Sequence, residues 1–381
     1  MTPGARAAAA ITVLDRVLGG EPAEKALTNW GRASRFAGSG DRAAVRDLVF
    51  DALRRRSSAA ALGGGLTGRG LILGLARAAA QEVLFSGEGH APPQPGPDDQ
   101  GRDPDADETL DLPDWLVPEL RDSLGADFAA VADALRSRAP VFLRVNLGKA
   151  DLPQAIAALA GEGIVARSHP LASTALEVTE NARKIQTSQA YLTGMVELQD
   201  ASSQAVVEAL PLADGMKVLD HCAGGGGKTL AMAARTDLRL YAHDANPRRM
   251  ADLPERARRA GVKVTLIDRP ETAAPYDLIL VDAPCSGSGS WRRDPEGKWK
   301  IRPETLAEIE QTQTSILDRV APMLSRGGVL AYATCSFLAR ENGAQARAFL
   351  DRHPGWHLDR ELTFTPLQGG DGFYLALFRG N

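Results

Sequence analysis

The amino-acid sequence predicts an α/β protein whose second half forms a parallel sheet and whose N-terminal region is all helical. From Gly215 onward, short apolar stretches typical of buried strands alternate with helical segments. This alternation is typical of parallel sheets that bind ligands at the carboxyl ends of their strands. From Ala7 to about Phe85, apolar residues recur at spacings of three and four, as at Val13 and Val17, which indicates amphipathic helices.

A segment rich in Pro, Gly and Asp, SGEGHAPPQPGPDDQGRDPDADE, follows the helical region. Such a composition buries little apolar surface and favours a mobile linker. We therefore expect a helical domain at 1–90, a linker at 91–110, a helical and small α/β subdomain at 111–205, and the main α/β domain at 206–381. In the subdomain, PVFLRVN, GIVARSHP and ALEVTE read as strands, and DLPQAIAALAGEG reads as a helix.

The main domain shows its elements in an alternating order. The expected strands are MKVLD, LRLYAHD, VKVTLID, YDLILVD and GGVLAYAT, with a final strand at GFYLALF. Helices are expected from Lys228, from Asn246, near 303–325 and near 340–352. Functional side chains should therefore lie where each of these strands ends.

The composition is that of an ordinary globular protein, with 44% hydrophobic and 24% charged residues. Its apolar runs fall short of the ~20 residues that span a bilayer, and its N-terminus does not resemble a secretory signal. We therefore expect a cytoplasmic monomer that has no membrane partner. The three cysteines, Cys222, Cys285 and Cys335, are too few and too scattered for a disulfide framework or a zinc knuckle, so we expect no bound metal.

Charge is unevenly distributed along the chain. The net charge is −4, but residues 1–70 carry eleven Arg and Lys against six Asp and Glu, including those of GRASRF and of Arg54, Arg55 and Arg56. Residues 98–122 carry ten acids against two bases. A basic N-terminal region can bind a polyanion such as RNA, whereas the alternative is a solvated Arg-rich helix face.

The stretch VLDHCAGGGGKT (218–229) places four glycines where a strand passes into a helix. Glycines there let the backbone approach a ligand closely, and the helix N-terminus faces it. The P-loop pattern is not met, because Cys222 stands where its first glycine is required. The candidate ligand-binding residues of this loop are Cys222, Ala223, Gly224, Gly225, Gly226, Gly227 and Lys228.

An acid ends each of the next three expected strands, at Asp244, Asp268 and Asp282. Carboxylates at such positions accept hydrogen bonds from a ribose diol, from an adenine amino group and from a bound base. Three acids in register with a glycine loop resemble the S-adenosylmethionine site of class I methyltransferases. The short interval between Asp268 and the next strand makes the adenine contact the least secure of the three.

Two cysteines also follow strand ends. Cys285 lies in DAPCSGSG after the fourth strand, and Cys335 lies in YATCSF after the fifth, so their thiols should converge beside the glycine loop. The alternative reading is a pair of buried thiols, since free cysteine often packs as a small hydrophobic residue. Cys222, within the loop, is expected to be a packing residue.

Taken together, LDHCAGGGGK, DAPCSGSG with WRRDPEGKW, and YATCSF with ENGAQARAFL resemble the motifs of the RNA cytosine-C5 methyltransferases, nearest the bacterial RsmB/Fmu (Sun) type. The resemblance covers roughly 110–380, and residues 1–85 resemble a NusB-like RNA-binding domain. It implies a class I (Rossmann-like) methyltransferase domain behind an all-α NusB-like domain and a small α/β subdomain. The chain departs from the family loop at Gly224 and Gly225, where Ala and Pro are usual, which leaves the loop less rigid.

The resemblance also implies a mechanism and a substrate, ribosomal RNA. Cys335 would add to C6 of cytosine, Cys285 would assist release, Asp282 would hold the base edge, and Lys228 would favour the thiolate. The stretch WRRDPEGKWKIR, with five bases against two acids, could grip the displaced strand or be an ordinary surface loop. The alternatives are a class I methyltransferase acting on tRNA, protein or a small molecule, and a catalytically weak RNA-binding assembly factor.

Overall fold

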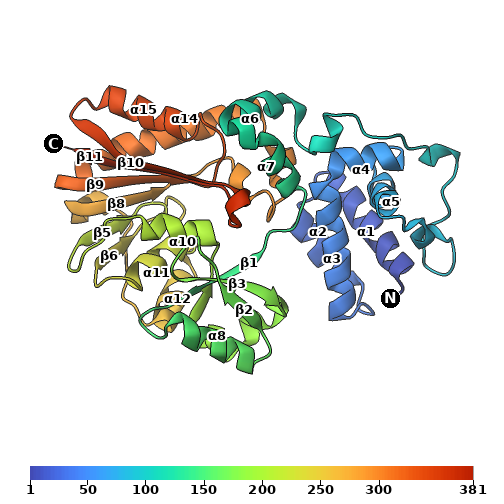
Figure 1. Cartoon of the computed structure of the whole chain (residues 1–381), viewed down its shortest axis with the longest axis horizontal. Coiled ribbons are helices and arrows are strands. Elements are labelled where there is room, and N and C mark those ends of the chain that lie inside the picture. Colours follow the sequence, from blue (N-terminus) through green and yellow to red (C-terminus); the bar gives the residue numbers. More distant parts are fainter. Residues whose placement is uncertain (381) are drawn as a thin grey trace. The chain divides into compact units, whose positions relative to one another are not determined.

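The computed structural model describes residues 1–380, which divide into two compact units (Figure 1). Unit 1 comprises Met1–Arg138 together with Trp291–Lys300, and unit 2 comprises Ala139–Ser290 and the chain from Ile301 onward. The compact units thus divide at Arg138, rather than in the Pro- and Asp-rich segment where the sequence places a linker.

Unit 1 is helical. Its helices are α1 (Pro3–Leu18), α2 (Ala23–Ala33), α3 (Ser39–Arg54), α4 (Arg56–Gly63), α5 (Gly68–Ala78), α6 (Val117–Leu124), α7 (Phe128–Leu135) and the short α13 (Gly297–Lys300). Hydroxyl caps begin two of them: Thr2 accepts from the Ala5 amide, and Thr67 from the Gly70 amide. The first five pack around one core of Ala, Val and Leu side chains, as the helical periodicity predicts.

Helices α4 and α5 approach one another unusually closely because glycines line their contact. A Cβ added at Gly63 would lie 1.7 Å from the carbonyl oxygen of Gly70, and one added at Gly74 would lie 1.9 Å from that of Ala59. Only glycine fits at these two positions. Among residues 1–380, no single helix is long and apolar enough to cross a membrane; the pair α4 and α5, bent by 89°, meets the length and composition test only when taken together.

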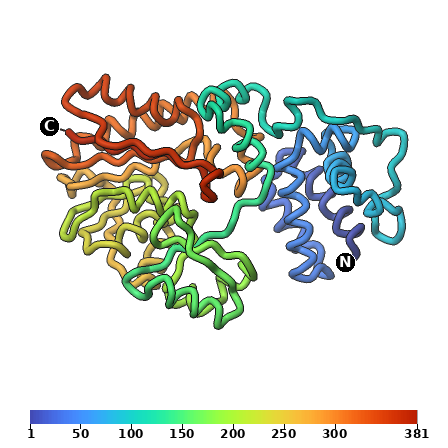
Figure 2. The backbone as a smooth tube through the Cα atoms, in the orientation of Figure 1, coloured from blue at the N-terminus to red at the C-terminus, as the bar shows by residue number. Residues whose placement is uncertain are grey.

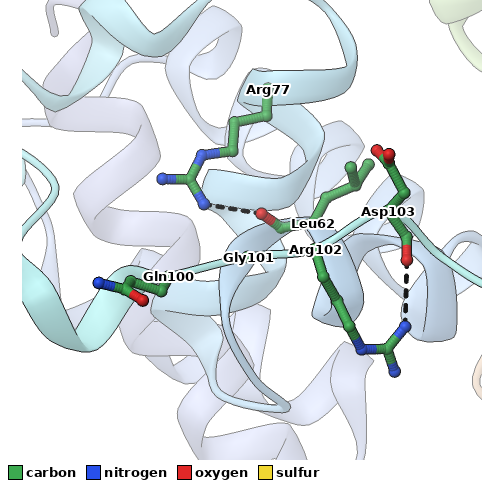
Figure 3. A pocket seen from close by; sticks show the side chains of 6 residues that line it. All are labelled: Leu62, Arg77, Gln100, Gly101, Arg102 and Asp103. Atoms are coloured by element: carbon green, nitrogen blue, oxygen red, sulfur yellow. Dashed lines mark hydrogen bonds between the residues drawn. The ribbon is translucent and has the colours of Figure 1, made fainter.

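The Pro- and Asp-rich segment runs along the helical unit (Figure 2). Arg69 of α5 donates two hydrogen bonds to Asp99 at 2.8 Å. Arg77, also of α5, donates to the carbonyl oxygens of Leu62 at 2.7 Å and Asp99 at 2.9 Å, at the edge of a shallow cleft of about 520 Å³ (Figure 3). Polar contacts to the backbone therefore hold a segment that composition alone marks as a linker.

The segment Trp291–Lys300 folds with unit 1, although it follows the DAPCSGSG motif in sequence. Lys298 Nζ donates to the carbonyl oxygen of Arg54 at 2.8 Å, and Trp299 Nε1 donates to that of Leu53 at 2.7 Å. Trp291 and Lys298 are 1% and 0% exposed. These two side chains are buried, so they form neither an RNA grip nor a surface loop, and Lys298 is bonded to the end of α3.

Unit 2 begins with a small antiparallel sheet in the order β2-β3-β1-β4. Its elements are β1 (Val141–Val145), α8 (Leu152–Gly161), β2 (Val165–Ser168), β3 (Ala175–Glu180), the one-turn α9 (Gln189–Leu192) and β4 (Val196–Leu198). Helix α8 begins with a capping box between Asp151 and Gln154. The three strands and the helix that the sequence predicts for this subdomain are confirmed.

The main sheet of unit 2 has the order β10-β11-β9-β8-β5-β6-β7. Its strands are β5 (Lys217–Asp220), β6 (Arg239–Ala242), β7 (Thr265–Leu266), β8 (Tyr276–Asp282), β9 (Leu324–Thr334), β10 (Trp356–Phe364) and β11 (Phe373–Gly380). The five strands from β5 to β9 are parallel, and β11 runs antiparallel to both β9 and β10. This confirms the predicted parallel α/β sheet.

Helices cover both faces of this sheet. Helices α14 (Pro303–Val320) and α15 (Gly343–Arg352) pack on one face (Figure 1). Helices α10 (Ala201–Glu208) and α11 (Gly227–Ala233) pack on the other, with α12 (Leu253–Ala260) beside α11. Neighbouring residues of one strand enter different cores: Ile279 packs under α14 and Leu280 under α10.

Two edge elements differ from the sequence expectations. The expected strand VKVTLID pairs only over Thr265–Leu266, both of which are exposed at the sheet edge. The edge strand β10 was not predicted, because its side chains are largely exposed on both faces and it lacks an apolar alternation. The helix expected from Asn246 starts later, at Leu253, after a single 3₁₀ turn.

Candidate active site

Four of the sequence-predicted site residues meet at the carboxyl ends of β8 and β9 and at the start of α11. Lys228 Nζ lies 2.8 Å from Asp282 Oδ2 and 4.7 Å from the centre of the Phe373 ring. The sulphur atoms of Cys285 and Cys335 lie 3.3 Å apart. The ammonium, the carboxylate and two thiols are therefore brought together by three different segments.

The parallel register of β8 and β9 explains why the thiols meet. Asp282 of β8 pairs with Ala333 of β9. Cys285 comes three residues after Asp282 and Cys335 two residues after Ala333, so both thiols lie just beyond the same edge of the sheet. The hydrogen bond to Cys335 and burial raise the pKa of Cys285 well above its usual value. Cys285 is therefore held toward its protonated form, with its Sγ in hydrogen-bond contact with Cys335 Sγ.

Lys228 supplies the positive charge of the site. Burial alone lowers the pKa of Lys228, but the charge and hydrogen bond of Asp282 outweigh burial and raise it above the usual value. A negative charge on Cys335 acts in the same direction. Since the interaction is mutual, the ammonium stabilises a thiolate on Cys335.

The glycine loop adopts a conformation that side chains would prevent. Gly226 has φ +80° and its amide donates to the carbonyl oxygen of Ala223 at 2.8 Å. A Cβ at Gly226 would lie 2.2 Å from a methyl of Leu253 in α12. Gly224 also has a positive φ of +51°. The loop thus forms a tight backbone turn before α11 and presents main-chain atoms instead of side chains.

Asp244 lies just beyond β6 with its side chain 4% exposed, and it holds the glycine loop. Its Oδ2 accepts from the amide of Gly224 at 2.9 Å and lies 3.3 Å from Arg249 Nη1, and its Oδ1 accepts from the amide of Asn246 at 2.9 Å. Each carboxylate oxygen has two lone pairs, so the group can accept a further hydrogen bond from a ligand.

The remaining two predicted residues have different surroundings. Asp268 is exposed at the end of the β7 edge, where the sequence already made its role the least secure. Cys222 is half-buried against the core under α14, and burial raises its pKa above the usual value. This burial agrees with the packing role expected for Cys222.

Sequence reasoning missed Asp220, which ends β5 directly before the glycine loop. Asp220 Oδ2 accepts from Thr229 Oγ1 at 2.6 Å, and Oδ1 is buried with no hydrogen-bond partner among the described residues. Burial raises the pKa of Asp220 to about 7. The signal was present, since Asp220 ends its strand as Asp282 does.

Arg144 of β1 was also missed, although it lies within the FLRVN stretch. Arg144 Nη1 donates to the carbonyl oxygen of Gly227 at 2.9 Å and to Gln199 Oε1 at 2.7 Å. Burial lowers the pKa of Arg144 to about 10. The small sheet therefore supports the glycine loop through a buried guanidinium, a contact that connects two regions distant in sequence.

The sheet order, the antiparallel β11 and the glycine loop after the central strand β5 define the class I (Rossmann-like) methyltransferase fold. Unit 1 fits the expected NusB-like helical domain. The crystal structure of PH0851 has a TM-score of 0.77 and 21% identity, covering 99% of both chains, so it shares the fold throughout. No group of three or more His, Cys, Asp or Glu that could hold a metal ion is found within residues 1–380.

Comparisons of sequence narrow this class to a family. Residues 207–379 match the family model "16S rRNA methyltransferase RsmB/F", and residues 112–186 match the ferredoxin-like domain of RsmF/B-like methyltransferases. The part of the chain from 112 to 379 thus belongs to the RsmB/F methyltransferase family.

Named relatives agree with this assignment. Ribosomal RNA small subunit methyltransferase B of Citrobacter koseri is 34% identical over 283 residues, and that of Yersinia pestis is 34% identical over 280 residues. Each match covers 69% of this chain and 65% of the relative, so the chain spans about two thirds of the length of these proteins. A methyltransferase homologue from Pyrococcus horikoshii has a TM-score of 0.63 and 25% identity, over 71% of this chain and 96% of that one.

Proposed function

We propose that this protein transfers a methyl group from S-adenosylmethionine to C5 of a cytosine in RNA, and that the RNA is that of the small ribosomal subunit. The observation that carries the proposal is the pair of thiols 3.3 Å apart beside the Lys228 and Asp282 ion pair. A methyltransferase that acts on a nucleophilic oxygen or nitrogen needs no such pair, whereas cytosine C5 requires covalent activation. Membership of the RsmB/F family supports the choice of ribosomal RNA.

The residues around the glycine loop fit S-adenosylmethionine. The positive φ values of Gly224 and Gly226 form a tight turn of main-chain atoms before α11, which suits close approach of the donor to the backbone. The unpartnered Oδ1 of Asp220 can accept from an amino group, and Asp244 can accept from a ribose hydroxyl. When bound, S-adenosylmethionine supplies an electrophilic methyl group on a sulfonium.

The residues of the chain then account for the remaining chemistry. Cys335 Sγ, as thiolate, forms a bond to C6 of cytosine, and Lys228 stabilises that thiolate beforehand. The C5=C6 electrons move toward C5, which takes the methyl group. Asp282 holds the N3/N4 edge of the base. Release requires transfer of the C5 proton to water as the C6–S bond breaks, which restores the ring double bond and the Cys335 thiolate. Cys285 takes part in this step.

A covalent trap tests the proposal on the full chain. Small-subunit RNA carrying 5-fluorocytosine has no C5 proton to lose, so the C6–S bond cannot be cleaved after methyl transfer. We expect a protein–RNA adduct that survives denaturing electrophoresis and requires S-adenosylmethionine. Calorimetric donor binding with no adduct would instead favour another methyl acceptor, and the absence of donor binding would favour an RNA-binding assembly factor.

A further inference from the structure

Glu341 is a fully buried carboxylate that the mechanism above does not use. It lies in the loop between β9 and α15, and its side chain is 0% exposed. Its Oε1 accepts from the amide of Ser286 at 2.7 Å and from Gln313 Nε2 at 3.3 Å. Its Oε2 accepts from the hydroxyls of Ser286, at 2.6 Å, and of Ser336.

The positions of these donors are informative. Ser286 directly follows Cys285, and Ser336 directly follows Cys335. One carboxylate therefore hydrogen-bonds the residue that comes after each thiol, and through them it connects the loop beyond β8 to the loop beyond β9. We propose that Glu341 is a positioning residue that sets the separation of the two thiols. That this separation matters for catalysis rests on the proposed function, whereas the effect of Glu341 on the separation does not.

Further contacts between the two loops follow the same arrangement. Ser288 Oγ lies 3.1 Å from Ser336 Oγ and accepts from the amide of Phe337 at 2.8 Å. The amide of Gly289 donates to the carbonyl oxygen of Cys335 at 3.0 Å. These contacts involve Ser336, which also donates to Glu341, or residues next to Ser336. The carboxylate is therefore part of one hydrogen-bond network that joins the two loops carrying the thiols.

Burial is the larger effect on Glu341 and raises its pKa, and the hydrogen bonds from Ser286, Ser336 and Gln313 oppose that effect in part. Gln313 of α14 also donates to the carbonyl oxygen of Pro284, one residue before Cys285. A buried group that accepts four hydrogen bonds fixes its donors firmly, because moving any of them leaves a polar atom unpaired.

The test measures the geometry of the thiols directly, without RNA or donor. In a glutathione buffer, glutathione disulfide oxidises the two thiols to a Cys285–Cys335 disulfide and is itself reduced to two molecules of glutathione. The position of this equilibrium gives the effective concentration of one thiol near the other. We expect Glu341→Gln to lower it by about tenfold, because an amide replaces an acceptor oxygen with a donor facing Ser286. Glu361→Gln, a change on the exposed strand β10, should leave it unchanged.

A milder variant keeps the test decisive if Glu341→Gln does not fold. Ser286→Ala removes one hydroxyl donor and leaves the other three hydrogen bonds to Glu341 in place, so we expect a smaller fall in the same direction. Glu341→Asp should give a value between those of Glu341→Gln and wild type. The proposal would be overturned if every one of these variants that folds had the same effective thiol concentration as wild type.

Activity separates this inference from the proposed function. If the RNA is methylated, Glu341→Gln should lower kcat while the Kd for S-adenosylmethionine stays the same. A lowered effective concentration in a protein that methylates no RNA would sustain the inference and refute the proposed function. If wild type methylates the RNA normally and the thiol equilibrium is unchanged in the variants, the proposed function stands and the inference about Glu341 is refuted.

Discussion

Cys285 Sγ and Cys335 Sγ lie 3.3 Å apart, although 50 residues separate them in the chain. The hydrogen bond between them and burial raise the pKa of Cys285, which favours its protonated form. A group that contacts one of these thiols therefore lies beside the other as well.

The two thiols should not be interchangeable. Cys335→Ala should abolish methylation and form no adduct, because no thiolate remains to attack C6. Cys285→Ala should still permit attack but slow release, leaving protein crosslinked to RNA. Denaturing gels after incubation with RNA and donor measure both. Cys222→Ala is the matched control and should behave as wild type; adduct from Cys335→Ala with none from Cys285→Ala would reverse the assignment.

Gly225→Pro should tighten donor binding modestly. The φ of Gly225 is not in the left-handed region, and the nearest atom to an added Cβ is the flexible Arg256 Nη1 at 3.0 Å. Proline at a compatible position stabilises by ~0.4–1 kcal/mol, equivalent to about a two- to fivefold lower Kd. Gly226→Ala should weaken binding, since its Cβ meets Leu253. Calorimetric titration checks both, and weaker binding by Gly225→Pro would show that the loop needs a conformation proline forbids.

RNA affinity should depend on two exposed arginines, one in the last turn of α2 and one in the connection to α3. Arg32 and Arg35 are exposed beside Phe36, which is 76% exposed, whereas Arg54 is buried. Removing one arginine–phosphate interaction should reduce the slope of log affinity against log salt by ~1. We expect the full-length double variant Arg32→Gln, Arg35→Gln to bind RNA more weakly and with a flatter salt dependence, in filter binding across a salt series.

The control for that experiment is Arg326→Gln, which removes an exposed charge from unit 2. Donor binding should be equal in all three proteins. An unchanged RNA affinity and salt slope in the double variant would return these arginines to the role of solvated surface. Substitutions are preferable to deleting residues 1–90, because the deletion would expose Trp291 and Lys298.

Stability should fall as pH rises from about 4 to about 7 because of Asp220. Its carboxyl has a pKa of about 7 when folded, against 3.8 for the ordinary group, so between these values unfolding releases a proton. The stabilisation is complete below about pH 4 and is lost by about pH 7. A shift of ~3 units corresponds to about 4 kcal/mol. Urea unfolding at several pH values should show a shallower decline for Asp220→Asn; parallel curves would contradict the assignment.

The fold was predictable because its central strands are apolar and regularly alternate with helices. YDLILVD is buried almost throughout as β8, and the acid or cysteine after such a strand can lie only at the carboxyl edge. Edge elements escaped prediction because solvent exposure removes the apolar pattern, as in β10 and β7.

The candidate site was predictable where residues follow strands and unpredictable where distant segments meet. Lys228 and Asp282 could be placed from sequence alone, as could both thiols. The contact of Arg144 with Gly227 spans 83 residues, and that of Glu341 with Ser286 spans 55. Local sequence spacing does not indicate which polar side chains will meet across so many residues, because tertiary packing determines those contacts.

The inclusion of Trp291–Lys300 in unit 1 has a consequence for biosynthesis. The ribosome delivers the N-terminal helices first. The segment that covers the end of α3 emerges only after about three quarters of the polypeptide has been made. Until then, the surface that receives Trp291 and Lys298 is exposed to water. The helical unit can therefore complete its folding only late in translation, after the strands that carry the glycine loop and Cys285 have left the exit tunnel.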